Sequence, residues 1–543
     1  MADYEKIKEA SSKHPKPADK TFQYGTAGFR MKANLLNSVV YRVGLLAALR
    51  SRKLNGQTIG VMITASHNPP EDNGVKLVDP MGEMLEASWE PYATELANAQ
   101  SEDELVKIYE KLTEDVKAKP GAPARVIYAR DTRASGSTLV ACLKDALDAT
   151  GTEYTDYKHL TTPQLHYLVR CVNTKGTQYE YGEVSEQGYY KKIAAAFKQA
   201  MKHKKTTGPV TVDCANGVGG PKLVELKKHL PGASEGGVDI KVVNDDVLKP
   251  EALNSQCGAD FVKTQQRAPP SSKISSGDRC ASLDGDADRI VYYFADKDNT
   301  FRLLDGDRIA TLAASFLADL GRASGLAEQL KIGVVQTAYA NGASTQYVEK
   351  NLKLPILCTN TGVKHLHHAA QRFDIGVYFE ANGHGTVLFS PAALKAIANY
   401  EPQSPAQKNA LETLRAVTEL INQTVGDALS DLLLVEVILA HKGWTCQEWL
   451  NTYVDLPNRL VRVEVKDRNI FQAVDAERKL EKPEGAQKDI ETEIAKYTKG
   501  RSFARASGTE DAVRVYAEAS TRGEADDLAA RVSAVVRRYG GVA

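Results

Sequence analysis

Three aspartates at alternate positions form the densest cluster of chemical groups in the chain. Asp284, Asp286 and Asp288 stand in Leu-Asp-Gly-Asp-Ala-Asp-Arg, directly before the apolar run 290–294. The small residues between them allow the carboxylates to converge on one hard cation in a tight loop. A calcium-binding helix–loop–helix is excluded, because Arg289 stands where that loop requires glycine and Ala295 where it requires glutamate. The alternative is a solvated acidic turn.

A serine between an apolar strand and a proline-rich turn is the second reactive group. Residues 58–63 predict a short buried strand, and Thr-Ala-Ser-His-Asn-Pro-Pro follows from Thr64. Pro69 and Pro70 fix their own backbone angles, and Pro69 also pushes Asn68 out of the α region. We therefore expect Ser66 on a stiff, exposed turn, where a reacting hydroxyl is held in place. An ordinary turn at a strand end fits the spacing equally well.

Two segments carry cations or donors that suit a phosphate. The glycine-punctuated stretch 21–30 ends in Arg30, although a surface arginine is the commoner outcome of such a pattern. Near the carboxyl end, Arg-Ala-Ser-Gly-Thr-Glu begins at Arg505, with Arg514 beyond it. Hydroxyls and backbone N–H groups of Ser507, Gly508 and Thr509 can donate to a phosphate there. A plain hairpin turn is the competing interpretation.

A carboxylate and an amide on a glycine-rich loop suit the hydroxyls of a sugar. This loop, Glu-Ala-Asn-Gly-His-Gly, follows the apolar run 375–379 and contains Glu380, Asn382, Gly383 and His384. A second candidate is Thr-Gly-Val-Lys-His, which ends in Lys364 and His365. The nearby histidines lack a thiol or glutamate at a familiar ligand spacing, so a zinc site there is not favoured.

Composition narrows the class of protein. The 543 residues include 69 basic and 69 acidic side chains, which argues against a protein dominated by nucleic-acid binding and suits a small anionic substrate. The amino terminus is polar, and the most apolar run, 432–440, is short and contains Glu436, so we expect neither a signal peptide nor a membrane span. Seven scattered cysteines indicate reduced thiols in a cytoplasmic protein.

Alternating strands and helices must position these groups. The pattern predicts an α/β fold, with three successive α/β units and a smaller carboxyl-terminal α+β domain around a central cleft. We expect four domains, which span residues 1–180, 181–300, 301–445 and 446–543, and each contains one of the candidate loops around Ser66, the three aspartates, Asn382 and Arg505. We expect the segment 71–76 to continue the loop after Ser66. Asn37 is expected to cap a helix that runs through Arg52. The turn 216–220 is expected to join a strand to a helix.

Four of these motifs resemble the α-D-phosphohexomutases. They are T-A-S-H-N-P-P-x-D-N-G-V-K, D-G-D-A-D-R, the E-A-N-G-H loop and R-x-S-G-T-E-x-x-x-R, in this order along nearly the whole chain. The G-T-A-G-x-R and R-D-T-R-x-S segments also resemble that superfamily. Within it, D-N-G-V-K is most similar to the phosphoacetylglucosamine mutases. Relatives that use glucose or mannose typically carry serine where this chain has Asn382, which favours an acetylamino sugar.

The resemblance implies a role for each candidate residue. Ser66 would carry the phosphoryl group, and one Mg²⁺ would be held by Asp284, Asp286, Asp288 and an oxygen of phosphorylated Ser66. The implied catalytic neighbours of Ser66 are Arg30, His67, Lys76 and Arg130, among which the general base is unassigned. The implied substrate contacts are Arg289, Lys364, His365, Glu380, Asn382, Gly383, His384, Arg505, Ser507, Gly508, Thr509 and Arg514.

The implied reaction interconverts N-acetylglucosamine 6-phosphate and 1-phosphate through a phosphoserine enzyme and a glucosamine-type 1,6-bisphosphate, which also acts as activator. It would supply UDP-N-acetylglucosamine synthesis. The rival predictions are the same mechanism on glucose or mannose phosphates and an inactive relative that acts as a binding protein. We expect a phosphosugar as partner, no nucleic acid or membrane, and a monomer or weak dimer.

Overall fold

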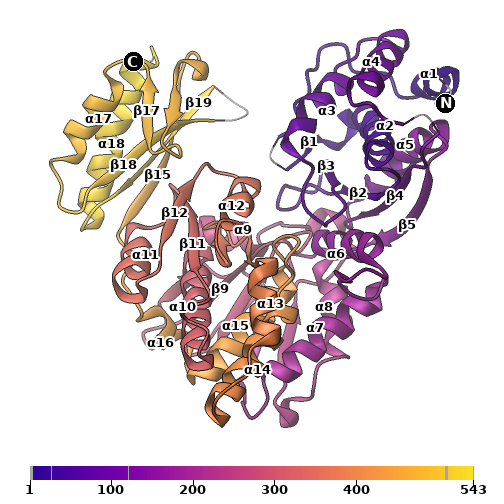
Figure 1. Ribbon diagram of the computed structural model, residues 1–543. Coiled ribbons are helices and arrows are strands. Elements are labelled where there is room, and N and C mark those ends of the chain that lie inside the picture. The colour runs from indigo at the N-terminus through magenta and orange to yellow at the C-terminus, as the bar shows by residue number, and fades with distance from the viewer. Residues whose placement is uncertain (1–3, 26, 120, 508–510, 542–543) are drawn as a thin grey trace. The chain divides into compact units, whose positions relative to one another are not determined.

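The computed structural model describes residues 4–25, 27–119, 121–507 and 511–541 (Figure 1). The chain forms two compact units, each built from separate stretches of sequence. The first unit contains Met1–Asp305, Asn382–Thr386 and Glu412–Cys446, and the second contains Gly306–Ala381, Val387–Leu411 and Gln447–Ala543.

The first sheet of the first unit places the serine loop. Its strand order is β1-β3-β2-β4-β5, with bounds Phe29–Lys32, Asp72–Val78, Thr58–Ile63, Arg125–Arg130 and Glu153–His159. All six residues of the central strand β2 are buried, as expected for an apolar run covered on both faces. Because β2 and β4 run parallel, their carboxyl ends meet at one edge of the sheet. The helices of this part are α1 (Tyr4–Ser11), α2 (Asn37–Lys53), α3 (Glu90–Ala97), α4 (Glu102–Asp115), α5 (Gly136–Ala149) and α6 (Thr162–Thr174).

The second sheet places the aspartate loop. Its order is β10-β9-β8-β6-β7, with bounds Phe301–Leu304, Ile290–Ala295, Arg279–Leu283, Val210–Asp213 and Ile240–Val243. The aspartates lie on the connection between the antiparallel strands β8 and β9. Strand β6 is parallel to β8, so the turn after β6 lies at the same edge as this connection. The helices here are α7 (Glu186–Ala200), α8 (Gly219–Lys227), α9 (Gly258–Gln265) and α15 (Ala428–Lys442).

Helix α15 belongs to the first unit although it follows much of the second unit in sequence. Asp427 caps its amino end by accepting hydrogen bonds from the N–H groups of the next turn. Further along, buried Glu436 accepts a bond from Tyr292 of β9 and pairs with Arg279 of β8 at 2.8 Å. The sheet and the helix therefore share a buried polar contact that neither can satisfy alone.

The second unit holds the remaining sheets, apart from the first two residues of β14, which belong to the first unit. A four-stranded sheet has the order β12-β11-β13-β14, with bounds Ile356–Thr359, Ile332–Thr337, Ile375–Phe379 and Gly385–Phe389. Its neighbours in sequence are α10 (Gly306–Ser324), α11 (Gly342–Gln346), η5 (Tyr347–Leu352), α12 (Val363–Ala370), α13 (Pro391–Asn399), α14 (Pro405–Leu420) and α16 (Cys446–Leu450).

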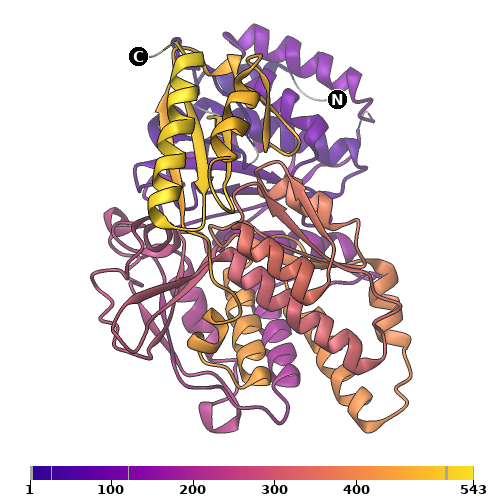
Figure 2. The ribbon, with the colours of Figure 1, turned by 90° about the vertical axis from the view of Figure 1, so that its left-hand side faces the viewer.

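The carboxyl-terminal part of the second unit is an antiparallel sheet with helices on one face. The sheet has the order β15-β19-β18, with bounds Asn458–Glu464, Ala512–Glu518 and Arg501–Ala506, beside the hairpin of β16 (Gln472–Val474) and β17 (Lys479–Lys482). Helix α18 (Arg522–Tyr539) packs on β15 and β19 and against α17 (Ala486–Ile494), as both views show in yellow (Figures 1 and 2). The predicted fold class, α/β units followed by a smaller α+β domain, is confirmed.

Two local predictions are wrong. Residues 72–76 were expected to continue a loop, but they form strand β3, which pairs antiparallel with both β1 and β2. Asn37 was expected to cap α2, but it is the first helical residue, and Leu36 precedes it without a side-chain cap. At β3, pairing with a strand on each side overrides the local preference of Asn73-Gly74 for a turn.

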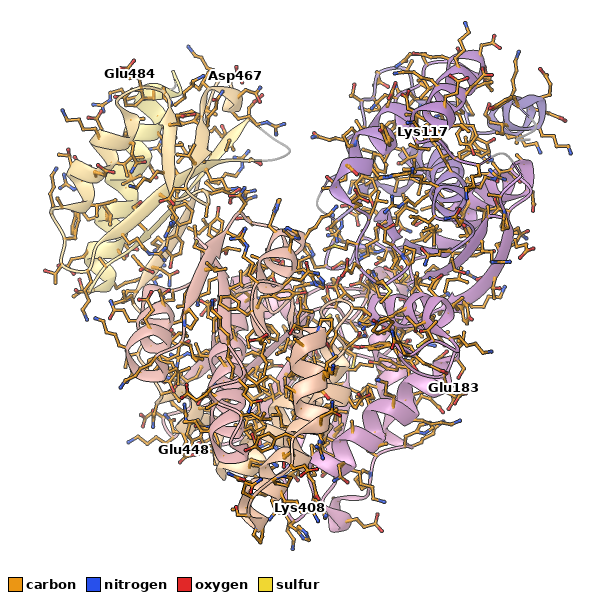
Figure 3. All side chains as sticks on the ribbon, in the orientation of Figure 1. Lys117, Glu183, Lys408, Glu448, Asp467 and Glu484 are labelled. Atoms are coloured by element: carbon orange, nitrogen blue, oxygen red, sulfur yellow. The ribbon has the colours of Figure 1, made fainter. Side chains whose placement is uncertain are left out.

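Charged side chains cover the outside of both units. Those that point outward in Figure 3 include Lys117, Glu183, Lys408, Glu448, Asp467 and Glu484. Within the described ranges, no helix combines the length and the apolar character needed to cross a membrane.

Candidate active site

Ser66 follows the buried strand β2 in a strained conformation. Its φ is +52°, in the left-handed region that non-glycine residues rarely adopt. Such a residue costs roughly 1–3 kcal/mol and persists only where surrounding contacts hold it. Its N–H donates to the Thr64 hydroxyl at 2.9 Å, and the residue is fully buried, so the expectation of an exposed turn is wrong. The serine is enclosed because strands and loops from both sheets surround it.

Arg133 holds the serine loop from the adjacent strand end. The residue follows β4, and its guanidinium pairs with Asp131 at 3.0 Å. The same guanidinium donates to four carbonyl oxygens of the loop, those of Ser66, Asn68, Pro69 and Asp72, at 2.6–3.0 Å. Sequence reasoning singled out Arg130 in this motif, whereas Arg130 pairs with Asp156 at 3.3 Å. The R-D-T-R spacing contained the signal for Arg133, but only the fold shows which arginine turns toward the serine.

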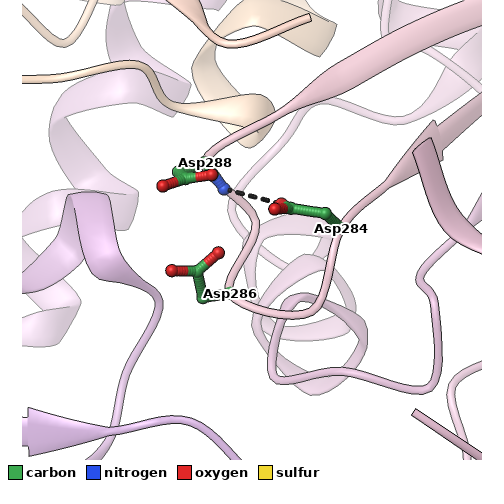
Figure 4. A group of neighbouring side chains, drawn as sticks. All are labelled: Asp284, Asp286 and Asp288. Atoms are coloured by element: carbon green, nitrogen blue, oxygen red, sulfur yellow. Dashed lines mark hydrogen bonds between the residues drawn. The ribbon is translucent and has the colours of Figure 1, made fainter. Parts of the chain in front are cut away.

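The three aspartates converge in the loop between β8 and β9 (Figure 4). One ligand oxygen from each lies within 4.8 Å of the others, and all three residues are buried. Ala287, between the second and third aspartates, has a φ of +57°, which lets the loop turn tightly. The N–H of Asp288 donates to Asp284 Oδ1 at 3.1 Å, and this bond is the dashed line in Figure 4.

The electrostatics of this loop favour a bound cation. Burial and the charges of Asp288 and Asp286 raise the pKa of Asp284 well above its ordinary value. Burial acts in the same direction on Asp288, but His384 and Lys76 hold the pKa of that carboxyl well below its ordinary value. Lys76 Nζ lies 3.5 Å from Asp286 and Asp288, and His384 Nδ1 lies 3.3 Å from Asp288. Arg289 Nε also lies 3.9 Å from Asp284 and from Asp288, yet burial and the neighbouring carboxylates still raise the pKa of Asp284. A cation bound among the three carboxylates would relieve that repulsion.

The donor set fits Mg²⁺. Asp286 Oδ1 is buried and has no hydrogen-bond partner, which leaves one oxygen of that carboxylate for a metal. Ser66 Oγ donates to Asp284 Oδ2 at 2.6 Å and lies 3.5 Å from Asp288 Oδ1, so an oxygen attached to this serine would join the same group. Oxygen ligands from a few carboxylates and a phosphate are typical of Mg²⁺.

Thr162 determines which oxygen of Asp286 faces this site, and sequence reasoning missed it. Its hydroxyl donates to Asp286 Oδ2 at 2.6 Å and its N–H donates to Asp286 O at 3.2 Å. Thr162 begins α6, whose amino end is fixed by a capping box between Thr161 and Gln164. The side chain is therefore positioned by the helix start, about 120 residues away from the aspartate in sequence.

We predict that Thr162→Val weakens metal binding about 10- to 100-fold, because it removes a hydrogen bond that orients a metal ligand. The measurement is Mn²⁺ binding followed by electron paramagnetic resonance, together with the Mg²⁺ dependence of turnover. Turnover at saturating Mg²⁺ should approach the wild-type value. Thr113→Val, which removes a hydroxyl on α4, is the control. An unchanged Mn²⁺ affinity in Thr162→Val would contradict the assigned role.

Two arginines, Arg30 and Arg289, lie close to each other and to His67, the residue after Ser66. Arg30 lies on β1 and pairs with Gly74 of β3. A Cβ atom added at Gly74 would lie 2.5 Å from Thr64 O, so the backbone is tightly packed at this position. Burial lowers the pKa of Arg30, and the positive charge of Arg289 lowers it further. Arg289, burial and Arg30 lower the pKa of His67 to about 2, so this imidazole is neutral near pH 7. Such mutual repulsion among cations favours an anion such as a phosphoryl group beside them.

The sugar loop touches the aspartate loop within the first unit. Ile290 N–H donates to Gly383 O at 3.1 Å, and the backbones of His384 and Arg289 form an isolated antiparallel β-bridge. Gly383 has a φ of +90°, and a Cβ atom there would lie 1.9 Å from Ile290 O, so only glycine fits. Asn382 Oδ1 accepts the N–H of His384 at 3.0 Å.

The remaining predicted contacts lie in the second unit. Glu380 accepts a hydrogen bond from the N–H of Gly362 at 3.2 Å. Gly362 directly precedes α12, the helix that carries Lys364 and His365. Arg505 and Arg514 are opposite each other on β18 and β19, and Arg505 pairs with Glu477 at 2.9 Å. Two arginines at directly opposite positions repel unless an anion lies near them. Ser507 N–H donates to Ala512 O, while Gly508 and Thr509 lie outside the described residues.

Comparisons with known proteins agree with these motifs. Family models described as Phosphoacetylglucosamine mutase AMG1, domains II and III, match residues 181–291 and 305–444. Models for phosphoglucomutase/phosphomannomutase match residues 45–104 (alpha/beta/alpha domain I) and 460–535 (C-terminal domain). A Schizosaccharomyces pombe protein called phosphoacetylglucosamine mutase 2 is 50% identical, and the match covers 97% of this chain and 96% of that protein.

Solved structures extend the comparison to three dimensions. The Aspergillus fumigatus N-acetylphosphoglucosamine mutase in complex with GlcNAc-6P and magnesium is 68% identical, covers 99% of both chains and has a TM-score of 0.96. A serine-to-alanine variant of that enzyme, in complex with glucose 1,6-bisphosphate, has the same identity, coverage and TM-score. The serine loop, the aspartate loop and these matches along the whole chain lead to one conclusion: the chain belongs to the phosphoacetylglucosamine mutase family.

Proposed function

We propose that this chain interconverts N-acetylglucosamine 6-phosphate and N-acetylglucosamine 1-phosphate. The observation that carries the proposal is the position of Ser66 Oγ, 2.6 Å from one buried aspartate of a three-carboxylate loop and on a backbone held by Arg133. A rigid hydroxyl beside a Mg²⁺-type site is what phosphoryl transfer requires, because this chemistry depends on positioning and on neutralisation of charge.

The reaction proceeds through phosphorylated Ser66. Its phosphoryl group passes to the 1-hydroxyl of the 6-phosphate, the bond to Ser66 Oγ breaks, and a 1,6-bisphosphate forms. After the bisphosphate turns over, Ser66 recovers the phosphoryl group from the 6-position and the 1-phosphate is released. The product suits UDP-N-acetylglucosamine synthesis, in which a nucleotidyl group is added to a sugar 1-phosphate.

Each group near Ser66 has a proposed role. Asp284, Asp286 and Asp288 would hold Mg²⁺, which supplies positive charge to the transferring phosphoryl oxygens when bound. Arg30 and Arg289 orient and neutralise the phosphoryl group, and Lys76 offsets the charge of Asp286 and Asp288. The general base stays unassigned among Arg30, His67, Lys76 and Arg130, and the lowered pKa of His67 makes this imidazole a weak proton acceptor.

We also propose how the other predicted residues share the substrate. Asn382, Gly383 and His384 contact the sugar together with Glu380, Lys364 and His365. Arg505, Ser507, Gly508, Thr509 and Arg514 hold the phosphate that is not reacting. The four domains 1–180, 181–300, 301–445 and 446–543, a cytoplasmic location and a monomeric or weakly dimeric state stay predictions.

A coupled assay with three sugar phosphates in parallel tests the function. N-acetylglucosamine, glucose and mannose phosphates are each supplied with Mg²⁺ and the matching 1,6-bisphosphate, and the formation of the isomeric monophosphate is followed. We expect the highest kcat/KM with the N-acetylglucosamine phosphates. Equal or higher values with glucose or mannose phosphates would favour the rival specificity, and no turnover with any of them would favour a binding protein.

Asn382→Ser tests the basis of the sugar preference. We expect the side-chain amide of Asn382 to form a hydrogen bond with the acetyl group of the sugar. One such hydrogen bond is worth about 1 kcal/mol, so kcat/KM for the N-acetylglucosamine phosphate should fall about tenfold. The value for glucose 6-phosphate should change much less. Equal losses on both sugars would show that Asn382 only shapes the loop.

A further inference from the structure

The carbonyl oxygen of Ser66 is held from two sides. Arg133 donates to it from the first sheet at 2.9 Å. From the second sheet's side, the amide nitrogen of Asn254 donates to the same oxygen at 2.8 Å and to Asn68 O at 3.1 Å. Asn254 lies in the loop between the short helix Pro250–Ala252 and α9, and 188 residues separate it from Ser66.

Asn254 is itself held in place by the turn after β6. Its φ is +55°, a conformation that asparagine tolerates better than most residues, and its N–H donates to Ala215 O at 2.9 Å. The buried carboxylate of Asp213 accepts N–H bonds from Ala215 at 3.0 Å and from Gly258 at 2.7 Å. These contacts fix both ends of the loop that presents the Asn254 amide.

The aspartate loop packs against the same point. A Cβ atom at Gly285 would lie 2.6 Å from Ser66 O and 2.9 Å from Asn254 Nδ2. On its other side, Gly285 O accepts the N–H of Val218 at 3.1 Å. The serine loop, the aspartate loop and the loop of Asn254 therefore meet around one carbonyl oxygen.

We infer that Asn254 is a positioning residue, which sets the place of the Ser66 hydroxyl relative to the aspartate loop. The inference rests on the proposed mutase function. Arg133 belongs to the same sheet as Ser66 and holds the serine loop on that sheet. Asn254 is fixed to the turn that also supports the aspartate loop, so its two hydrogen bonds join the nucleophile to the metal ligands. Without them the left-handed backbone of Ser66 is held from one side alone.

Asn254→Gly and Asn254→Asp test the inference. Glycine accepts the left-handed backbone but removes the donor, and aspartate keeps the shape but places carboxylate oxygens against two carbonyl oxygens. Asn55→Gly is the matched control, because Asn55 has a φ of +56°, is exposed and lies at the end of α2. For each variant we would measure the melting midpoint, kcat, KM and the single-turnover rate of Ser66 phosphorylation by glucose 1,6-bisphosphate, read by intact mass.

We expect both Asn254 variants to lose about 10- to 100-fold in kcat and in the phosphorylation rate, the range typical of groups that orient reacting ones. KM should be unchanged, because Asn254 does not contact the sugar in the proposed roles. Asn55→Gly should match wild type in all kinetic values. Aspartate should be at least as harmful as glycine, since it repels the carbonyls.

Three outcomes overturn the inference: wild-type kcat in either Asn254 variant, a rise in KM without a fall in kcat, or losses in kcat that simply follow the unfolded fraction at the assay temperature. The proposed function fails separately. In that case the wild-type protein itself shows no turnover with N-acetylglucosamine phosphates, whatever the variants do.

Discussion

Ser66→Ala is expected to abolish turnover while the fold persists. The hydroxyl is the group that carries the phosphoryl between substrate molecules, and no other residue can replace a missing nucleophile at this position. Stability should change by only about 1 kcal/mol, since one hydrogen bond to Asp284 is lost and a methyl group fits the same space. The left-handed backbone at this position costs alanine about as much as it costs serine, because both residues carry a Cβ atom.

Coupled turnover assays, thermal melting and intact-mass measurements check this expectation. Incubation with glucose 1,6-bisphosphate should add one phosphate to wild type and none to the variant. Ser12→Ala, which removes a hydroxyl on the surface near α1, is the control and should retain full activity. Substantial turnover by Ser66→Ala would refute the phosphoserine mechanism.

Removal of divalent metal should have an effect of similar size. Three buried carboxylates within 4.8 Å of one another face the serine, and a phosphate on that serine adds further negative charge. A cation must intervene for the phosphoserine to approach them. We therefore expect a chelator to stop turnover and added Mg²⁺ to restore it.

Asp286→Asn should mimic the chelator, because it removes one charged ligand while keeping the size of the side chain and its contact with Thr162. Titration with Mg²⁺ should then require far higher concentrations for partial recovery. Asp103→Asn, at an exposed ion pair with Lys8, controls for the loss of an acidic side chain. Full activity in the chelator would remove the metal from the mechanism.

The sequence predicted the reactive loops better than it predicted their surroundings. The apolar run before Ser66 and the alternate aspartates carry strong local patterns, so β2, β9 and the aspartate loop could be placed from spacing alone. Strand β3 could not, because Asn73-Gly74 favours a turn locally and only pairing with β1 and β2 makes it a strand. Tertiary contacts override local preference there.

The residues that hold the site in place were the least predictable. Thr162 and Asn254 contact groups more than 100 residues away, and each sits in a segment without a distinctive pattern. Arg133 lay in a recognised motif, but sequence spacing does not show which of two arginines turns inward. Burial of Ser66 was also missed, because proline-rich turns usually lie on the surface and here both sheets enclose one.

The placement of α15 has a consequence for the order in which the newly made chain folds. Chain synthesis proceeds from the amino end, and domains generally fold as they are completed. The first unit cannot be completed in this way, because Glu436, which neutralises buried Arg279, is made only after most of the α10–α14 region. The sheet that carries the aspartate loop therefore cannot complete its core until the segment up to Cys446 has been made, because until then Arg279 lacks the carboxylate of Glu436.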